Sequence, residues 1–202
     1  MMQLTRQWWS SILLSLGALF LGTAQAEVTV VMIRHAEKPA EDLGQLECKG
    51  LNRALKLGPL LTSRFGKADI VLAPNPAVKM TKGSSAWNYV RPLATIEPYA
   101  IRNGLPVNTE FGWNDPAAVV NFLLARQQGL VVAAWEHHII GEIANQLVKR
   151  LGSDQKIPEW HGDDFDSIFV FKIDASTSPK PTLISFAKLQ QGLNGQSSSC
   201  PQ

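Results

Sequence analysis

Short apolar runs alternate with amphipathic stretches along most of this chain. The first run, residues 28–33, is apolar or β-branched at every position, which predicts a strand buried on both faces. Similar runs predict five further strands. The six strands are expected at residues 28–33, 69–73, 105–108, 130–135, 167–173 and 182–187.

Between these runs, apolar residues recur at helical spacing. Pro59 is expected to kink or split the first helix, and Pro98 to limit the second. The third helix begins at Asn114-Asp115-Pro116, where a capping side chain is followed by proline in the first turn. The helices are expected at residues 51–65, from near 85 to 94, from 116 up to Gly129, and at 139–151, with a loop at 74–85.

The alternation of strands and helices indicates an α/β fold. Consecutive strand–helix–strand units favour a three-layer arrangement, in which a mainly parallel sheet is covered by helices on both faces. No stretch within residues 27–202 has the composition of an interdomain linker, so one domain is expected there.

The first 26 residues have the layout of a secretory signal peptide. They carry the basic residue Arg6, an apolar run at 12–21 and the small-residue motif Ala24-Gln25-Ala26. The apolar run is short for a membrane span, so cleavage is favoured over an anchor. The sequence therefore predicts an exported protein, either periplasmic in a bacterium or secreted, with no membrane span after cleavage.

Charge, cysteine content and motif spacing limit the partners and the kinds of site to expect. The net charge is +2, and removal of Arg6 leaves +1, which gives no reason to expect nucleic acid or an acidic membrane as partner. The two cysteines, Cys48 and Cys200, would meet an oxidising compartment after export, where a disulfide between them is one possibility. The sequence contains no zinc-ligand spacing and no glycine-rich phosphate loop.

Two predicted strands run directly into histidine. Residues 28–33 lead into Arg34-His35, and residues 130–135 lead into Glu136-His137-His138. In an open α/β sheet, ligands bind beyond the carboxyl ends of the strands, so these histidines are expected to meet at one edge.

Four elements resemble, in order, the histidine phosphatase superfamily, which includes phosphoglycerate mutases and acid phosphatases. The stretch RHAEKP after the first strand is similar to the family's RHG motif. The other three elements are the helix pattern Gly50, Arg53-Ala54, Leu57-Gly58 and Leu61, the stretch Arg91-Pro92-Leu93-Ala94-Thr95, and the strand end VVAAWEHH.

This resemblance implies a phosphoglycerate mutase-like fold and assigns roles to individual residues. His35 would be the nucleophile that carries a phosphohistidine, and Arg34, Arg91 and His137 would hold the phosphoryl oxygens. Arginine's planar fork suits phosphate, and the nucleophile must attack as a neutral imidazole. The resemblance implies neither a metal nor another cofactor.

Several assignments stay open in the sequence. His138 competes with His137 for the role of second histidine, and His137 is preferred because it comes first off the strand. Glu110 is the first choice of proton donor for the leaving group. Its alternatives are Glu37 and Glu136, although strand alternation would point Glu136 away from the site.

The chain also departs from the family pattern after the second strand. Residues 73–76 read Ala-Pro-Asn-Pro, and Arg91 follows only after a longer loop. Lys79 and Lys82 in that loop are either solvated charges or contacts for the distal part of a substrate.

We therefore expect a metal-independent phosphomonoesterase that acts on a small or accessible phosphate ester. A mutase is disfavoured because an exported protein has poor access to the phosphorylated intermediates that a mutase must retain. The alternative is a catalytically weak, phosphate-ligand-binding envelope protein of the same fold. A third hypothesis takes His137, His138 and Glu142 as metal ligands, but adjacent histidines rarely reach one ion.

Overall fold

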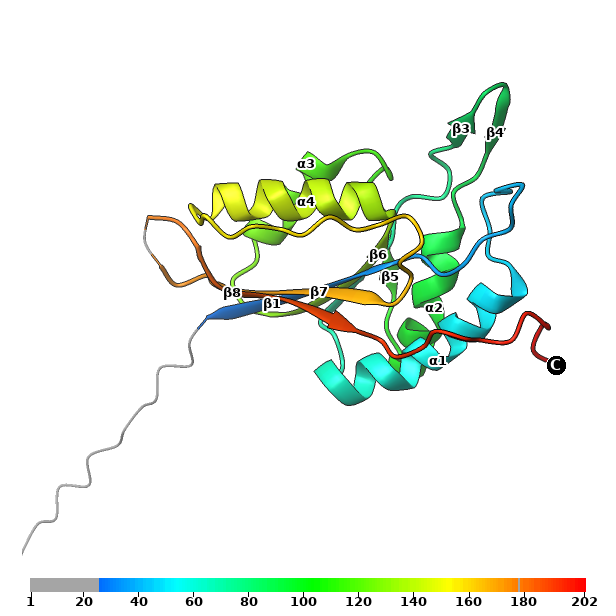
Figure 1. Cartoon of the computed structure of the whole chain (residues 1–202). Helices are drawn as coiled ribbons and strands as arrows, with labels where there is room; N and C mark the ends of the chain where they lie inside the picture. The colour runs from blue at the N-terminus through cyan, green and yellow to red at the C-terminus, as the bar shows by residue number, and fades with distance from the viewer. Residues whose placement is uncertain (1–25, 178) are drawn as a thin grey trace, which may run out of the picture.

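A computed structural model describes residues 26–177 and 179–202, with Lys82 described by its backbone only (Figure 1). The predicted signal peptide thus lies outside the described residues, apart from Ala26. No described helix is both long and apolar enough to cross a membrane.

The centre of the molecule is a six-stranded sheet with the order β5-β2-β6-β1-β7-β8. The first four of these strands pair in parallel, whereas β7 is antiparallel to both β1 and β8. The prediction of a mainly parallel sheet is confirmed. The strands are β1 (Glu27–Arg34), β2 (Ile70–Leu72), β5 (Val107–Asn108), β6 (Gly129–Trp135), β7 (Ser167–Asp174) and β8 (Thr182–Gln190).

Helices cover both faces of the sheet, as predicted (Figure 1). On one face, Val31 and Ile33 of β1 belong to a core shared with α1 (Cys48–Phe65) and α2 (Arg91–Asn103). On the other face, Val30 and Met32 belong to a core shared with α3 (Pro116–Leu124) and α4 (His137–Arg150). The strand is buried on both faces because its alternate side chains enter different cores.

The prediction for α2 is wrong in its bounds, and the loop at 74–85 contains structure. Residues 80–82 and 85–87 form a hairpin, β3 (Met80–Lys82) and β4 (Ser85–Trp87), that projects from the sheet (Figure 1). The helix begins only at Arg91 and continues past Pro98. Packing of its buried face against α1 outweighs the backbone donor that proline lacks.

The first helix is not split at Pro59. Helix α1 runs without interruption over 18 residues, and the proline lies on its exposed side. Leu57 and Leu61, on either side of it, are fully buried, so tertiary packing holds the helix together across the proline.

The C-terminal tail is attached to the start of α1. Cys48 and Cys200 form a disulfide over a sequence separation of 152 residues, which confirms the pairing that the sequence left open. Asn52 donates hydrogen bonds to the carbonyl oxygens of Ser197 and Ser199. The tail thus lies beside α1, as its red trace shows in Figure 1.

Candidate active site

The carboxyl ends of β1 and β6 lie side by side. The two strands are parallel neighbours in which Arg34 pairs with Trp135, so both end at the same level of the sheet. The backbone amide of His35 donates to the carbonyl of Trp135 over 2.9 Å, which extends the pairing one residue beyond the strand. The residues that follow the two strands therefore meet at one edge, as the sequence predicts.

His35 is held so that one ring nitrogen keeps the lone pair a nucleophile needs. The side chain is only 1% exposed, and its Nδ1 lies 2.8 Å from the carbonyl oxygen of Ala36. Since a carbonyl only accepts, Nδ1 carries the proton and Nε2 keeps its lone pair, which accepts from Arg91 Nε over 3.2 Å. Burial and the nearby charge of Arg91 lower the pKa of His35 well below its ordinary value, so the ring is neutral at pH 7.

Arg34 is oriented by a loop more than 120 residues away in the sequence. Its guanidinium donates to the carbonyl oxygens of Gly162 (2.6 Å) and Asp164 (3.3 Å) and lies 3.9 Å over the ring of Phe165. Its Nε is buried and meets no hydrogen-bond acceptor among the described residues. An arginine with an unused buried donor beside a nucleophile is suited to bind an anionic oxygen.

Arg91 is fixed at the first turn of α2 by the turn that precedes α1. Its Nη1 donates to the carboxylate of Asp42 over 2.7 Å, and its backbone amide donates to the carbonyl of Gly44 over 2.8 Å. Asp42, Leu43 and Gly44 all have positive φ, which is an uncommon conformation for the two residues with side chains. Burial opposes ionisation of Asp42, but its contacts with Lys38 and Arg91 outweigh this and lower its pKa.

Two further contacts fix the loop after β1. Thr95 Oγ1 accepts from the backbone amide of Ala36 over 2.9 Å and donates to the carbonyl of Arg91 over 2.7 Å. Gly50 allows α1 to approach the same loop, because a Cβ there would lie 2.2 Å from the carbonyl oxygen of Glu37. The loop that carries His35 is thus tied to both α1 and α2.

Of the two adjacent histidines, the structure places His137 at the site. It is 9% exposed, whereas His138 is exposed to solvent. Its Nε2 points toward Gly162, where an added Cβ would lie 3.6 Å away, and the carbonyl of Gly162 also accepts from Arg34. The fold thus brings His137, and not His138, to the site, and the role of His137 as the second histidine stays a prediction.

Glu136 does not point away from the site, so the expectation from strand alternation is wrong. The strand ends at Trp135, and Glu136 instead caps α4 by accepting from the backbone amide of Ile139 over 3.0 Å. Its other oxygen lies 2.5 Å from His137 Nδ1. Burial would raise the pKa of Glu136, but the hydrogen bond and charge of His137 outweigh burial and lower it.

Glu37 is committed to an ion pair. Both of its carboxylate oxygens accept from the Arg53 guanidinium over 2.9 Å, and the residue is buried. This engagement makes Glu37 a structural residue and a poor alternative as proton donor.

Glu110 lies at the same edge of the sheet, but beyond β5, which two strands separate from β1. It is exposed, and its carboxylate accepts from the side-chain amide of Asn108 over 3.0 Å. The loop that begins at Glu110 leads back toward the end of β6, where the carbonyl of Trp113 accepts from the Trp135 indole over 2.8 Å. Its role as proton donor stays a prediction.

Three residues of the site have no role in the sequence analysis. Asp42 fixes Arg91, Phe165 stacks on Arg34, and the Tyr89 ring lies beside both His35 and Arg91. Of these three residues, only Tyr89 could have been suspected from the sequence, because it lies two residues before Arg91. Asp42 and Phe165 lie in polar loops, where nothing in the sequence distinguishes them from solvated residues.

A metal ion could be held by a set that differs from the predicted one. One ligand atom each from Glu136, His137 and His138 lies within 4.8 Å of the others, with Glu136 in the place that the sequence hypothesis gave to Glu142. The Glu136 carboxylate already pairs with His137 and caps α4. An ion held between Glu136 and His137 would compete with this pair, so the cluster fits a metal poorly.

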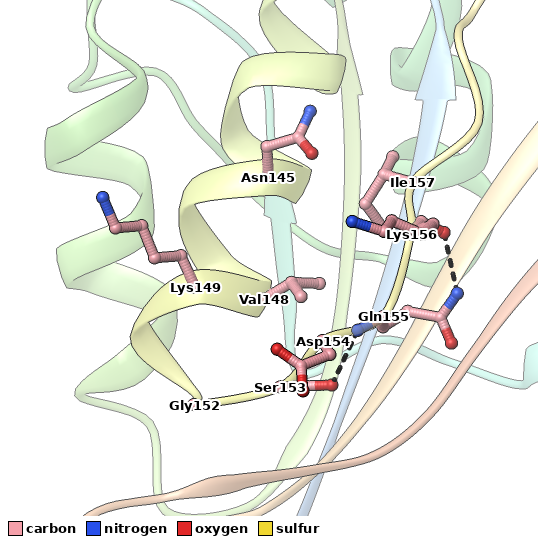
Figure 2. Close-up of a pocket in the computed structure, with 9 residues that line it drawn as sticks. All are labelled: Asn145, Val148, Lys149, Gly152, Ser153, Asp154, Gln155, Lys156 and Ile157. Carbon is pink, nitrogen blue, oxygen red and sulfur yellow. Dashed lines mark hydrogen bonds between the residues drawn. The ribbon is translucent and has the colours of Figure 1, made fainter.

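A groove begins at His137 and continues along α4. Its first part has a volume of about 390 Å³ and reaches from His137 past Glu142 to Asn145. The second part, about 480 Å³, shares Asn145 and Ile157 with the first. The chain turns back at Gly152, so residues 153–157 run alongside the helix and form the facing wall (Figure 2).

No family model matches the sequence, and no curated protein is significantly similar to it. Among solved structures, the chain is similar to a proposed phosphohistidine phosphatase, SixA, from Nakamurella multipartitia. The identity is 14% and the TM-score 0.48, and the match covers 80% of this chain and 95% of that one. For the proposed SixA from Agrobacterium tumefaciens, the identity is 15% and the TM-score 0.43, with 79% and 97% covered. Both descriptions name a phosphatase, but similarities this low do not by themselves assign a function.

Proposed function

We propose that this chain is a phosphomonoesterase of the histidine phosphatase type, which transfers a phosphoryl group from a small or accessible phosphate ester to His35. The observation that carries the proposal is the state of His35. It is a buried, neutral imidazole whose Nε2 lone pair faces a guanidinium, with a second guanidinium and a second histidine beside it. Phosphoryl transfer requires little more than an aligned nucleophile and fixed donors around the phosphoryl oxygens.

The reaction has two steps in this proposal. Nε2 of His35 attacks phosphorus, the bond to the ester oxygen breaks, and Glu110 supplies the proton that the leaving alkoxide needs. Arg34, Arg91 and His137 hold the phosphoryl oxygens. Water then attacks the phosphohistidine, so inorganic phosphate leaves, neutral His35 is restored, and the proton from water returns to Glu110.

Two features support the further parts of the proposal. The Cys48–Cys200 disulfide supports export, because disulfides persist mainly in oxidising compartments. The groove along α4 supports a phosphorylated substrate, because it offers space beside His137, one of the residues that hold the phosphoryl oxygens in this proposal. In this proposal the protein is periplasmic or secreted.

The test uses the purified protein without its first 26 residues. In EDTA, it should hydrolyse p-nitrophenyl phosphate and form an acid-labile, base-stable phosphoenzyme during turnover. Binding of inorganic phosphate with no turnover would support the alternative, a phosphate-ligand-binding protein that keeps the pocket. Activity that EDTA abolishes and zinc restores would contradict the metal-independent mechanism and favour the Glu136–His137–His138 cluster.

Replacing Glu110 by glutamine should slow the hydrolysis of an ester more when its leaving group has a greater need for a proton. We expect kcat/KM, which reports the transfer to His35, to fall about 100-fold for an alkyl phosphate but only a few-fold for p-nitrophenyl phosphate. The matched control is Glu97→Gln on the exposed face of α2, which should change neither rate. Equal losses on both esters would count against Glu110 as the proton donor.

A further inference from the structure

Tyr89 lies in the wall of the site next to the nucleophile. Its side chain is fully buried, and its ring meets the ring of His35 nearly edge-on, with the centroids 6.1 Å apart. The Arg91 guanidinium lies 4.7 Å from the ring centroid, and the Trp113 ring contacts it at 6.0 Å. These contacts with three different parts of the chain fix the position of the ring.

The proton of the Tyr89 hydroxyl, unlike the ring, has no partner. The hydroxyl is buried and finds no acceptor among the described residues, and the side chain that lies near it, Arg91, is itself only a donor. Buried tyrosine hydroxyls usually find a partner, and an unsatisfied one destabilises the fold. The ring contacts with His35 and Arg91 place this hydroxyl among the groups that surround the nucleophile.

A second donor in the same site is also unsatisfied, the Nε of Arg34. Two buried donors without acceptors, both beside one nucleophile, match a ligand that brings several acceptor oxygens at once. A phosphoryl group is such a ligand, and the charge on its oxygens in the transition state makes each donor more valuable.

We propose that the Tyr89 hydroxyl donates a hydrogen bond to a phosphoryl oxygen during transfer to and from His35. This inference rests on the proposed phosphatase function and adds a catalytic residue to it. The motif resemblance covers Arg91 but assigns nothing to the residue two positions earlier.

The hydroxyl remains a donor over the working pH range of the site. Burial raises the pKa of Tyr89, and the positive charge of Arg91 offsets only part of this effect. Tyr89 therefore binds the oxygen as a neutral donor, in contrast to the two guanidinium groups.

The test is Tyr89→Phe, which keeps the ring and removes only the hydroxyl. We expect kcat/KM to fall about 10- to 100-fold, the range for a lost hydrogen bond to a charged group. The factor should be the same for p-nitrophenyl phosphate and an alkyl phosphate, because the phosphoryl oxygens do not depend on the leaving group. The Tm should stay the same or rise, since the variant buries no unpaired hydroxyl.

Tyr99→Phe is the matched control, because Tyr99 is the other tyrosine of the chain. Its hydroxyl accepts from the amide of Ala68 over 2.8 Å and donates to the carbonyl of Gly66 over 2.9 Å. Its loss should lower the Tm and leave kcat/KM unchanged. The two variants should thus have opposite signatures.

Three results would overturn the role of Tyr89: unchanged kcat/KM, a loss confined to the alkyl ester, or a loss accompanied by a fall in Tm like that of Tyr99→Phe. If the wild-type protein hydrolyses neither ester, the proposed function fails but the inference is still tested. Calorimetry with inorganic phosphate should then give about 10-fold weaker binding to Tyr89→Phe, and equal affinities would reject the contact.

Discussion

Replacing His35 by alanine should lower kcat for p-nitrophenyl phosphate by about 10⁴-fold or more, because the reaction loses the atom that accepts the phosphoryl group. The wild-type ring is buried and neutral, and its Nε2 is aimed by the bond from Nδ1 to Ala36. No other described histidine occupies this position. The phosphoenzyme should also disappear, which can be followed by intact-protein mass spectrometry under alkaline quench.

Two other histidine variants serve as references for this result. His138→Ala should have wild-type activity, since His138 is exposed. His137→Ala should lose about 100-fold in kcat/KM but still form the phosphoenzyme, as expected for a residue that holds an oxygen rather than attacks phosphorus. Turnover at the wild-type rate by a folded His35→Ala variant would reject the nucleophile assignment.

The edge where the histidines meet could be predicted because it depends on strand pattern alone. An apolar run that is buried on both faces predicts a parallel strand, and parallel strands end on one side of the sheet. Arg34 and Trp135 are register partners, so the two histidine-bearing ends coincide.

The partners of these residues could not be predicted, because they arise from long-range contacts. Arg34 is positioned by carbonyl groups at Gly162 and Asp164, and a backbone carbonyl leaves no mark in the sequence. The hairpin at residues 80–87 was missed because its strands have three residues each and no apolar alternation. The predicted start of α2 near residue 85 is wrong for the same reason, since residues 85–87 form β4 and pair with β3.

Glu37 shows how a charged cluster in the sequence can mislead. Next to Arg34-His35 it has the position expected of a catalytic carboxylate. Its partner Arg53 is 16 residues later, on the face of α1 that the structure buries. The sequence resemblance included Arg53 only as part of a helix pattern, so its role emerges only from the folded chain.

Replacing Arg53 by methionine should destabilise the fold by about 3–5 kcal/mol, the cost of breaking a buried ion pair from one side. The guanidinium is 1% exposed, and all five of its N–H groups donate hydrogen bonds. The acceptors are Glu37, Asp166, Gln191 and Asn194, at 2.9–3.0 Å. The variant would leave two buried carboxylates without their common cation. It would also remove the hydrogen bonds to Gln191 and Asn194, which link the C-terminal tail to the loop that carries the nucleophile. Urea unfolding under non-reducing conditions measures the loss.

The control for this variant is Lys56→Met, on the exposed face of the same helix, where a change within about 0.5 kcal/mol is expected. Adding Glu37→Gln to the Arg53→Met chain should recover part of the loss, because it removes one of the unpaired charges that cause it. A loss below about 1 kcal/mol for Arg53→Met, or no recovery in the double variant, would mean that the buried charges are stabilised by other groups. The size of the recovery separates the contribution of Glu37 from that of Asp166, and so measures how strongly the loop after His35 depends on this one side chain.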